Sequence, residues 1–374
     1  MQGYFIFIIV AATLIMLGDI TRRKGFDKLT IRREAENSAV IEGEEFKITT
    51  IIENNKLLPI SFMVLEEKIP VNIPRVGEES YTSERGLYFF YLSKFSILWN
   101  ERMKRTFVYK AEKRGTYLLK EVNVSIGDIF GFSSDSARIN DFVEILVYPK
   151  IIDIRNFNFE STNIQGDSIV KRWIYKDPLY IRGIREYNVE DRMKDIHWKS
   201  SLKMDKLMVK DYDYTSEREI VIILNVQCGE PYWGTIIASL IENGIKLGVS
   251  LASQAIKEGI AVGMWTNAQL VSFSTKCNQE VKPSLNSLKG IMELCARVDY
   301  TPRIEFHEML KEKITSFNTN STYIIITPFL NEESEGILLK LKRSGVLLKL
   351  IDVSDKSKVP AIDGIEKIEY KGEY

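Results

Sequence analysis

The chain has 374 residues, 45% of them hydrophobic, which is enough for two or three compact domains with buried cores. Its 51 basic and 51 acidic side chains cancel, so no global field directs it to nucleic acid or to an acidic surface. Three cysteines without paired spacing exclude a disulfide scaffold, and two histidines leave almost no basis for a His-rich zinc or non-haem iron centre.

The N-terminal segment is apolar. The run from Tyr4 to Leu17 carries no charge, and a basic run follows at 22–24. With its flanks, the segment approaches the roughly 20 residues of a membrane-spanning helix, and it lacks the charged start and cleavage site of a signal peptide. We therefore expect a transmembrane anchor over residues 1–21 in a single-pass protein of the cell membrane, with a cleaved signal or a buried core helix as the alternatives. The basic run behind it predicts that the soluble domains face the cytoplasm.

Residues 28–150 have the two-residue period of β-strands. Val122, Val124 and Ile126, for example, alternate with polar residues. Turn-forming pairs such as Arg114-Gly115 separate roughly six to eight short runs of this kind, which predicts an antiparallel β-sandwich. Residues 151–219 then hold a linker and a segment rich in charged and aromatic side chains.

From 220 to 374, apolar strands alternate with amphipathic helices. A buried strand is expected at Ile220–Leu224 and a helix at Trp233–Lys257, whose Gly244 and Gly248 let it lie close to a sheet. Such alternation predicts a doubly wound, Rossmann-like α/β domain with a mainly parallel sheet. The other expected elements are strands at Ala261–Trp265, Thr322–Thr327 and Leu347–Val353, and helices at Ser284–Val298, Phe306–Phe317 and Glu332–Ser344.

The segment between the two domains resembles the central motif of the bacterial and archaeal domain-of-unknown-function 58 family. The matching residues are Arg185-Glu186-Tyr187, then Asp191, Ile196, Trp198 and Lys199, and then Leu207-Met208-Val209-Lys210. Three earlier segments are similar to the sandwich that often precedes this motif, so the resemblance spans most of the chain. These segments are Arg114-Gly115-x-Tyr117, Asp128-Ile129-Phe130-Gly131-Phe132 and Val147-Tyr148-Pro149.

This chain departs from the family's pattern at two places. Val189-Glu190 stands where the family has Pro-Gly, which suggests a less extreme turn, and Lys194 stands where it has Arg. Lysine keeps the charge but lacks the planar fork of a guanidinium. A carboxylate or phosphate contact at this position is therefore expected to be weaker.

The resemblance implies that the last domain, 220–374, is von Willebrand factor A-like. Metal-binding domains of that kind carry Asp-x-Ser-x-Ser after the first strand, because carboxylate and hydroxyl oxygens suit a divalent ion. Here Asn225, Gln227 and Gly229 occupy those positions. We therefore expect a degenerate site that holds no metal, and no cofactor elsewhere.

No sequence motif indicates an enzyme. The chain contains no phosphate-binding loop, no dinucleotide-binding glycine pattern and no nucleophile elbow. Strand alternation at 195–199 would place Ile196 and Trp198 on one face and His197 on the other, where it is a structural or solvated histidine. Cys228 has no neighbouring cation or histidine to lower its pKa. We expect a protein without catalytic activity.

The sequence thus predicts a non-catalytic, membrane-anchored adaptor or assembly factor that binds another protein. The resemblance implies a MoxR-type AAA+ ATPase as the partner. An alternative is nucleic-acid binding through 171–210, where 11 basic and 6 acidic residues are mixed with aromatic ones, and a hydrolase with an unrecognised site is a third possibility. The residues expected to make structural or partner contacts are Arg182, Arg185, Glu186, Tyr187, Asp191, Lys194, Trp198 and Lys199.

Overall fold

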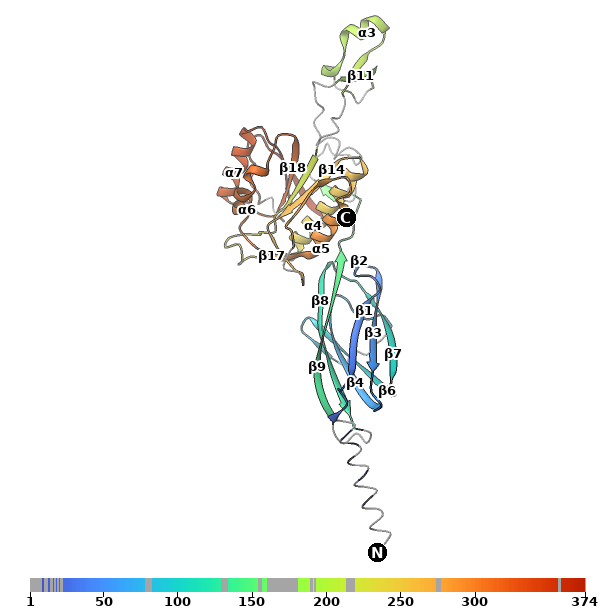
Figure 1. The fold of residues 1–374 in the computed structure, drawn as a ribbon. Helices are drawn as coiled ribbons and strands as arrows, with labels where there is room; N and C mark the ends of the chain where they lie inside the picture. The colour runs from blue at the N-terminus through green and yellow to red at the C-terminus, as the bar shows by residue number, and fades with distance from the viewer. Residues whose placement is uncertain are drawn as a thin grey trace. The chain divides into compact units, whose positions relative to one another are not determined.

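The computed structural model of the chain divides into two compact units, each described by itself below (Figure 1). Unit 1 comprises Met1–Lys150 and Val271–Cys277, and unit 2 comprises Ile151–Leu270 and Asn278–Tyr374. The structure describes residues 24–77, 83–128, 134–153, 157–159, 181–188, 191, 193–212, 219–273, 277–355 and 358–373, together with Ile9, Thr13, Met16, Gly18, Ile20 and Arg23.

The predicted transmembrane anchor is wrong for the residues that the structure describes, since none of their helices is long and apolar enough to cross a membrane. Most of 1–21 lies outside the described residues. In the sequence, the uncharged run from Tyr4 to Leu17 is itself shorter than the roughly 20 residues that span a bilayer, so the expectation depended on its flanks. The predicted fold class is therefore corrected in its first part: the described residues contain no membrane-spanning helix. The single-pass membrane localisation, its cytoplasmic orientation and the membrane contact are withdrawn with the anchor.

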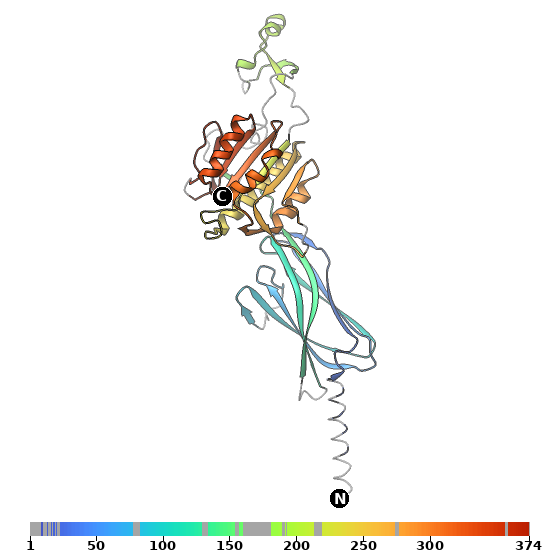
Figure 2. The ribbon, with the colours of Figure 1, turned by 60° about the vertical axis from the view of Figure 1, so that its left-hand side comes forward.

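Unit 1 contains two β-sheets (Figures 1 and 2), and buried side chains from both sheets form its core. One sheet has the strand order β1-β3-β7 and the other β2-β9-β8-β4-β6-β5, and the pairs are antiparallel except for β2 with β9. Val122, Val124 and Ile126 of β8 alternate into the core, as the two-residue period predicts. The strands are β1 Leu29–Ala35, β2 Ala39–Ile41, β3 Glu45–Asn54, β4 Ile60–Pro70, β5 Ser83–Arg85, β6 Tyr88–Ile97, β7 Glu101–Lys110, β8 Gly115–Gly127 and β9 Ser134–Tyr148.

Unit 2 contains a seven-stranded sheet with the order β10-β20-β19-β18-β13-β14-β16, in which only the outer strands β10 and β16 run antiparallel to their neighbours. Two further strands, β15 and β17, form a separate antiparallel pair. The strands are β10 Phe157–Phe159, β13 Glu219–Leu224, β14 Ala261–Thr266, β15 Ala268–Leu270, β16 Glu280–Ser284, β17 Val298–Pro302, β18 Ser321–Thr327, β19 Leu347–Asp352 and β20 Glu366–Glu373.

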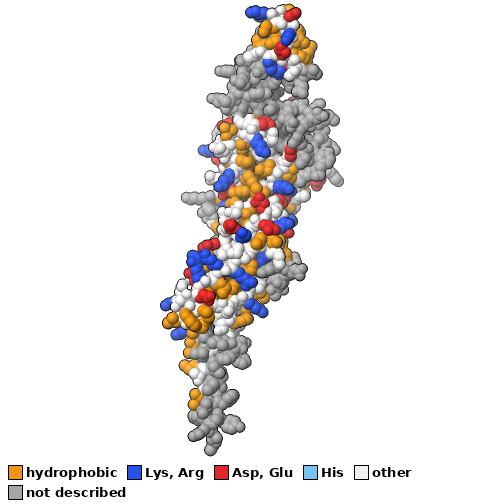
Figure 3. Space-filling view, turned by 90° about the vertical axis from the view of Figure 1, so that its right-hand side faces the viewer, with side chains coloured by type: hydrophobic (Ala, Val, Ile, Leu, Met, Phe, Trp, Pro, Cys, Tyr) orange, Lys and Arg blue, Asp and Glu red, His pale blue; other side chains and the backbone are white. Residues whose placement is uncertain are grey.

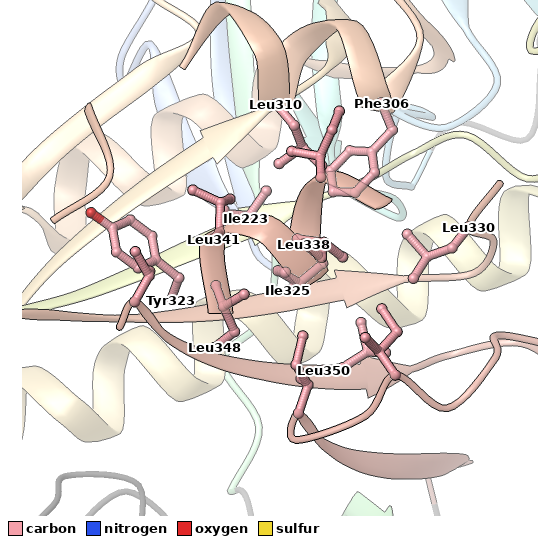
Figure 4. Close-up of a cluster of buried hydrophobic side chains, with 14 of the residues drawn as sticks. Ile223, Phe306, Leu310, Tyr323, Ile325, Leu330, Leu338, Leu341, Leu348 and Leu350 are labelled. Atoms are coloured by element: carbon pink, nitrogen blue, oxygen red, sulfur yellow. The ribbon is translucent and has the colours of Figure 1, made fainter. Parts of the chain in front are cut away.

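Helices cover both faces of this sheet. Alternate residues of each strand point toward opposite faces, so each strand contributes side chains to both layers. On one face, Ile223, Ile325 and Leu350 pack with side chains of α6 and α7 in the cluster of Figure 4. On the other face lies α4. A Cβ atom built on its Gly244 would be 3.3 Å from Leu224 Cδ1, which confirms that small residues let this helix approach the sheet. The helices are α4 Ala238–Lys257, α5 Leu288–Arg297, α6 Phe306–Glu312 and α7 Glu332–Arg343, with a 3-10 turn, η4, at Ile314–Ser316.

Candidate functional site

The predicted contact residues fall on a small substructure that we call the hairpin-helix module. It comprises β11 (Ile181–Glu186), the 3-10 turn η3 (Met193–Asp195), α3 (Trp198–Met204) and β12 (Met208–Tyr212). The two strands pair antiparallel, and Ile196 adds an isolated bridge to Val209. Ile196, Met208 and Val209 are buried and form the interior of the module.

Arg185 and Asp191 form a two-armed ion pair. The Nη2–Oδ1 distance is 2.5 Å and the Nη1–Oδ2 distance is 2.7 Å. The same carboxylate accepts a hydrogen bond from the Asn188 backbone N–H, at 2.8 Å. Because a bidentate pair with an added backbone donor is among the stronger polar contacts, it fastens Asp191 to the end of β11. The sequence motif therefore brings these two predicted residues together.

Of the other predicted residues, those that the structure describes lie at the surface of the module or contribute through their backbone. Glu186 and Lys206 form an exposed ion pair with an Oε1–Nζ distance of 2.9 Å, and this hydrogen bond raises the pKa of the Lys206 ammonium group. Tyr187 donates its backbone N–H to Leu207 O. Trp198 and Lys199 are exposed. The side chains of Arg182 and Lys194 lie outside the described residues.

The strand alternation expected at 195–199 is wrong, because a helix begins there. His197 is the N-cap of α3, and its Nδ1 accepts the Ser200 backbone N–H at 3.1 Å. The Ser201 hydroxyl accepts the Met208 backbone N–H at 2.8 Å and donates toward His197 O at 3.1 Å. These contacts satisfy polar groups at the start of the helix and fasten the helix to β12. His197 therefore has a capping contact in this module.

The exposure pattern of α3 is the reverse of that in most helices of folded domains. Its single buried residue is Ser201. Its large apolar side chains are in solvent instead, since Trp198 and Met204 are each 62% exposed and Leu202 is 85% exposed. Figure 3 shows hydrophobic side chains beside charged ones at this module, at the top of the view. The sequence analysis singled out Trp198 but missed Leu202, although the i, i+4 spacing of the two was a usable signal.

At the carboxyl ends of the parallel strands, a closed amide network occupies the positions where the sequence analysis expects a degenerate metal site. Asn225 Nδ2 donates to Thr327 Oγ1 at 2.8 Å and to Phe329 O at 3.0 Å. Asn225 Oδ1 accepts from Gln227 N at 2.9 Å and from Asn267 Nδ2 at 3.0 Å. The donors and acceptors of the Asn225 amide are thus fully used within the chain.

The neighbouring residues extend this network. Gln227 Oε1 accepts the Phe306 backbone N–H at 2.9 Å, and its Nε2 donates to Gly229 O at 3.2 Å. Burial raises the pKa of the adjacent Cys228 thiol, which keeps it in the less nucleophilic protonated form at neutral pH. Among the described residues, no group of three or more His, Cys, Asp or Glu side chains is arranged to hold a metal ion.

No family model matches the chain. It is 18% identical over 227 residues to the uncharacterized protein YeaD of Bacillus subtilis strain 168; the match covers 58% of this chain and spans about half, 54%, of that protein.

Two solved structures resemble about a third of the chain. A CARDB domain from Pyrococcus furiosus, in complex with di-metal ions, is 10% identical with a TM-score of 0.21, over 33% of this chain and 94% of that one. A non-cellulosomal cohesin from Archaeoglobus fulgidus is 18% identical with a TM-score of 0.22, over 32% of this chain and 91% of that one. At these scores neither likeness carries an argument about fold or function.

Proposed function

We propose that the chain is a non-catalytic adaptor that binds another protein through the hairpin-helix module. The observation that carries this proposal is the solvent-exposed apolar face of α3, where Trp198 and Leu202 lie one turn apart. Exposed apolar residues gathered on one face mark interaction sites, because covering them removes apolar surface from water. Tryptophan is also enriched among the residues that contribute most to protein–protein affinity.

The edge of the parallel sheet supports the non-catalytic part of the proposal. Open α/β sheets usually bind their ligands at the carboxyl ends of the strands. Here the amides of Asn225 and Gln227 are engaged with the chain's own atoms. A ligand at this edge would have to break several of these buried hydrogen bonds, each break costing about 1–3 kcal/mol.

The partner we propose is a MoxR-type AAA+ ATPase, on the basis of the motif that this chain shares in part with the domain-of-unknown-function 58 family. The ion pairs of Arg185 with Asp191 and of Lys206 with Glu186 neutralise part of the 171–210 segment. This favours a protein partner over nucleic acid, whose backbone requires uncompensated cations.

The test is affinity purification of the tagged full-length protein from its own cells, with and without ATP, and identification of the co-purifying proteins by mass spectrometry. The proposal predicts that a AAA+ ATPase is recovered and that Trp198→Ala abolishes its recovery while the chain remains folded by circular dichroism. Nuclease-sensitive material in place of a protein, or hydrolase activity of the purified chain that Trp198→Ala leaves unchanged, would contradict it.

A further inference from the structure

The exposed face of α3 has an apolar edge and a basic edge side by side. With about 100° between successive residues of a helix, Trp198 and Leu202 lie about 40° apart around the axis, and Lys199 and Lys203 continue the same arc. These four side chains therefore occupy one continuous surface, all of it exposed. Ser201, which lies outside this arc, is the residue of the helix that contacts β12.

The two lysines on this surface have no ion-pair partner among the described residues. None of the residues of the helix, Trp198–Met204, is acidic. Lys206, in contrast, lies just after the helix and is paired with Glu186. Two unpaired cations next to an exposed apolar edge leave both the charge and the apolar surface of α3 without a complement within the described chain.

We propose that this face binds an acidic amphipathic segment of a partner protein. Apolar side chains of the segment cover Trp198 and Leu202, and its carboxylates meet Lys199 and Lys203. Helix-in-groove and helix-on-helix recognition commonly combine an apolar anchor with a charged rim, and the rim charges suppress wrong partners. This inference rests on the proposed adaptor function and adds the chemistry of the partner.

Other occupants fit the surface less well. A second copy of this chain bound through the same face would place lysines against lysines, and opposed like charges are unfavourable. Single-stranded nucleic acid stacks its bases on several aromatic side chains, whereas Leu202 and Met204 offer no ring. A segment that carries both apolar and acidic side chains complements the apolar edge and the basic edge of α3 at once.

The first experiment identifies what touches the face. Leu202 is replaced in the full-length chain by the photo-crosslinking amino acid p-benzoylphenylalanine, cells are irradiated, and the crosslinked peptides are sequenced by mass spectrometry. The proposal predicts peptides of another protein in which Asp or Glu residues accompany apolar ones. Crosslinks to this same chain, to lipid, to nucleic acid or to peptides without acidic residues would overturn it.

A second experiment tests the charge separately from the apolar contact. The double variant Lys199→Glu/Lys203→Glu is expected to reduce the crosslinking yield by about tenfold or more, because it places carboxylates against the carboxylates of the partner, and opposed like charges are unfavourable. Lys199→Arg/Lys203→Arg keeps the positive charge and is expected to retain the yield. Circular dichroism verifies that both variants are folded. If charge reversal leaves the yield unchanged, the acidic partner is ruled out. The adaptor function nevertheless stands if Trp198→Ala still removes the partner.

Discussion

Charged side chains in the interior of unit 1 form ion pairs with one another. Arg33 of β1 donates to Asp141 of β9, with an Nε–Oδ2 distance of 2.6 Å, and Arg75 pairs with Glu67 of β4. Arg75 Nε also donates to the Tyr109 hydroxyl at 2.9 Å. A buried charge that loses its partner costs about 3–5 kcal/mol, so these contacts link the two sheets at fixed positions.

This environment predicts a loss of stability at high pH. Burial, and then the Glu67 carboxylate, raises the pKa of Tyr109, so the folded unit holds the proton at pH values where the unfolded chain, with an ordinary pKa of about 10, releases it. The stabilisation is complete below about pH 10 and is lost as the pH rises further, by up to about 1.4 kcal/mol per pH unit.

The free energy of unfolding of the full-length chain, measured with urea at about pH 8 and about pH 11, gives this loss. Amide hydrogen exchange of β7 reports separately on the strand that carries Tyr109. Tyr109→Phe removes the ionisable group and is expected to make the decrease shallower. An equal decrease in the wild type and in Tyr109→Phe would show that another group is responsible.

At the scale of single elements, the same substitution in β14 and in α7 is predicted to have opposite effects. A Cβ atom on Gly263 of β14 would lie 2.7 Å from the carbonyl oxygen of Val281, whereas one on Gly336 of α7 meets nothing within 4 Å. Gly263→Ala therefore forces the β14–β16 pair apart and lowers the free energy of unfolding by about 1–3 kcal/mol. Gly336→Ala raises it by about 0.5–1 kcal/mol, since alanine is the better helix former.

Thermal unfolding of the two single variants beside the wild type checks both signs. A destabilised Gly336→Ala, or a Gly263→Ala variant as stable as the wild type, would mean that the packing around that element differs from the one described.

The attachment of α3 to β12 makes a second prediction at this scale. Ser201 Oγ accepts the Met208 backbone N–H, so Ser201→Ala leaves this buried N–H without its side-chain acceptor, at a cost of about 1–3 kcal/mol to the module, whereas the Met208 carbonyl keeps the His197 backbone N–H. We expect faster hydrogen exchange at the Met208 amide. Ser200→Ala is the matched control, because the described contacts of Ser200 involve its backbone N–H. Equal exchange rates in the two variants would contradict the role of Ser201.

For the whole molecule, periodicity predicted individual elements well where burial alone decides the pattern. The strand at Ile220–Leu224 lies within β13, and the expected helix at Glu332–Ser344 is α7. The helix expected from Trp233 begins only at Ala238, because the Pro231 turn precedes it. The strand β20 was missed, since charged residues interrupt its apolar positions and its pairing with β19 is visible only in the folded sheet.

Sequence predicted the candidate site in part. It selected Arg185 and Asp191, which form an ion pair, and Trp198, which is exposed. It did not show that α3 buries a serine and exposes Leu202, because hydrogen bonds of Ser201 to Met208 of β12, and not apolar packing, attach the helix to the strand. The finding that no helix of the described residues is long and apolar enough to cross a membrane also required the structure.

The central claim is that the exposed face of α3 binds a partner protein, and a comparison of two leucines tests it most directly. Leu202 and Leu57 are 85% and 82% exposed, but Leu57 lies in unit 1, between β3 and β4. The measurement is the amount of each co-purifying protein recovered with full-length Leu202→Ala and with Leu57→Ala. We predict a loss of about tenfold or more for the partner with Leu202→Ala and wild-type recovery with Leu57→Ala. Wild-type recovery with Leu202→Ala, or an equal loss with both variants, would contradict the account.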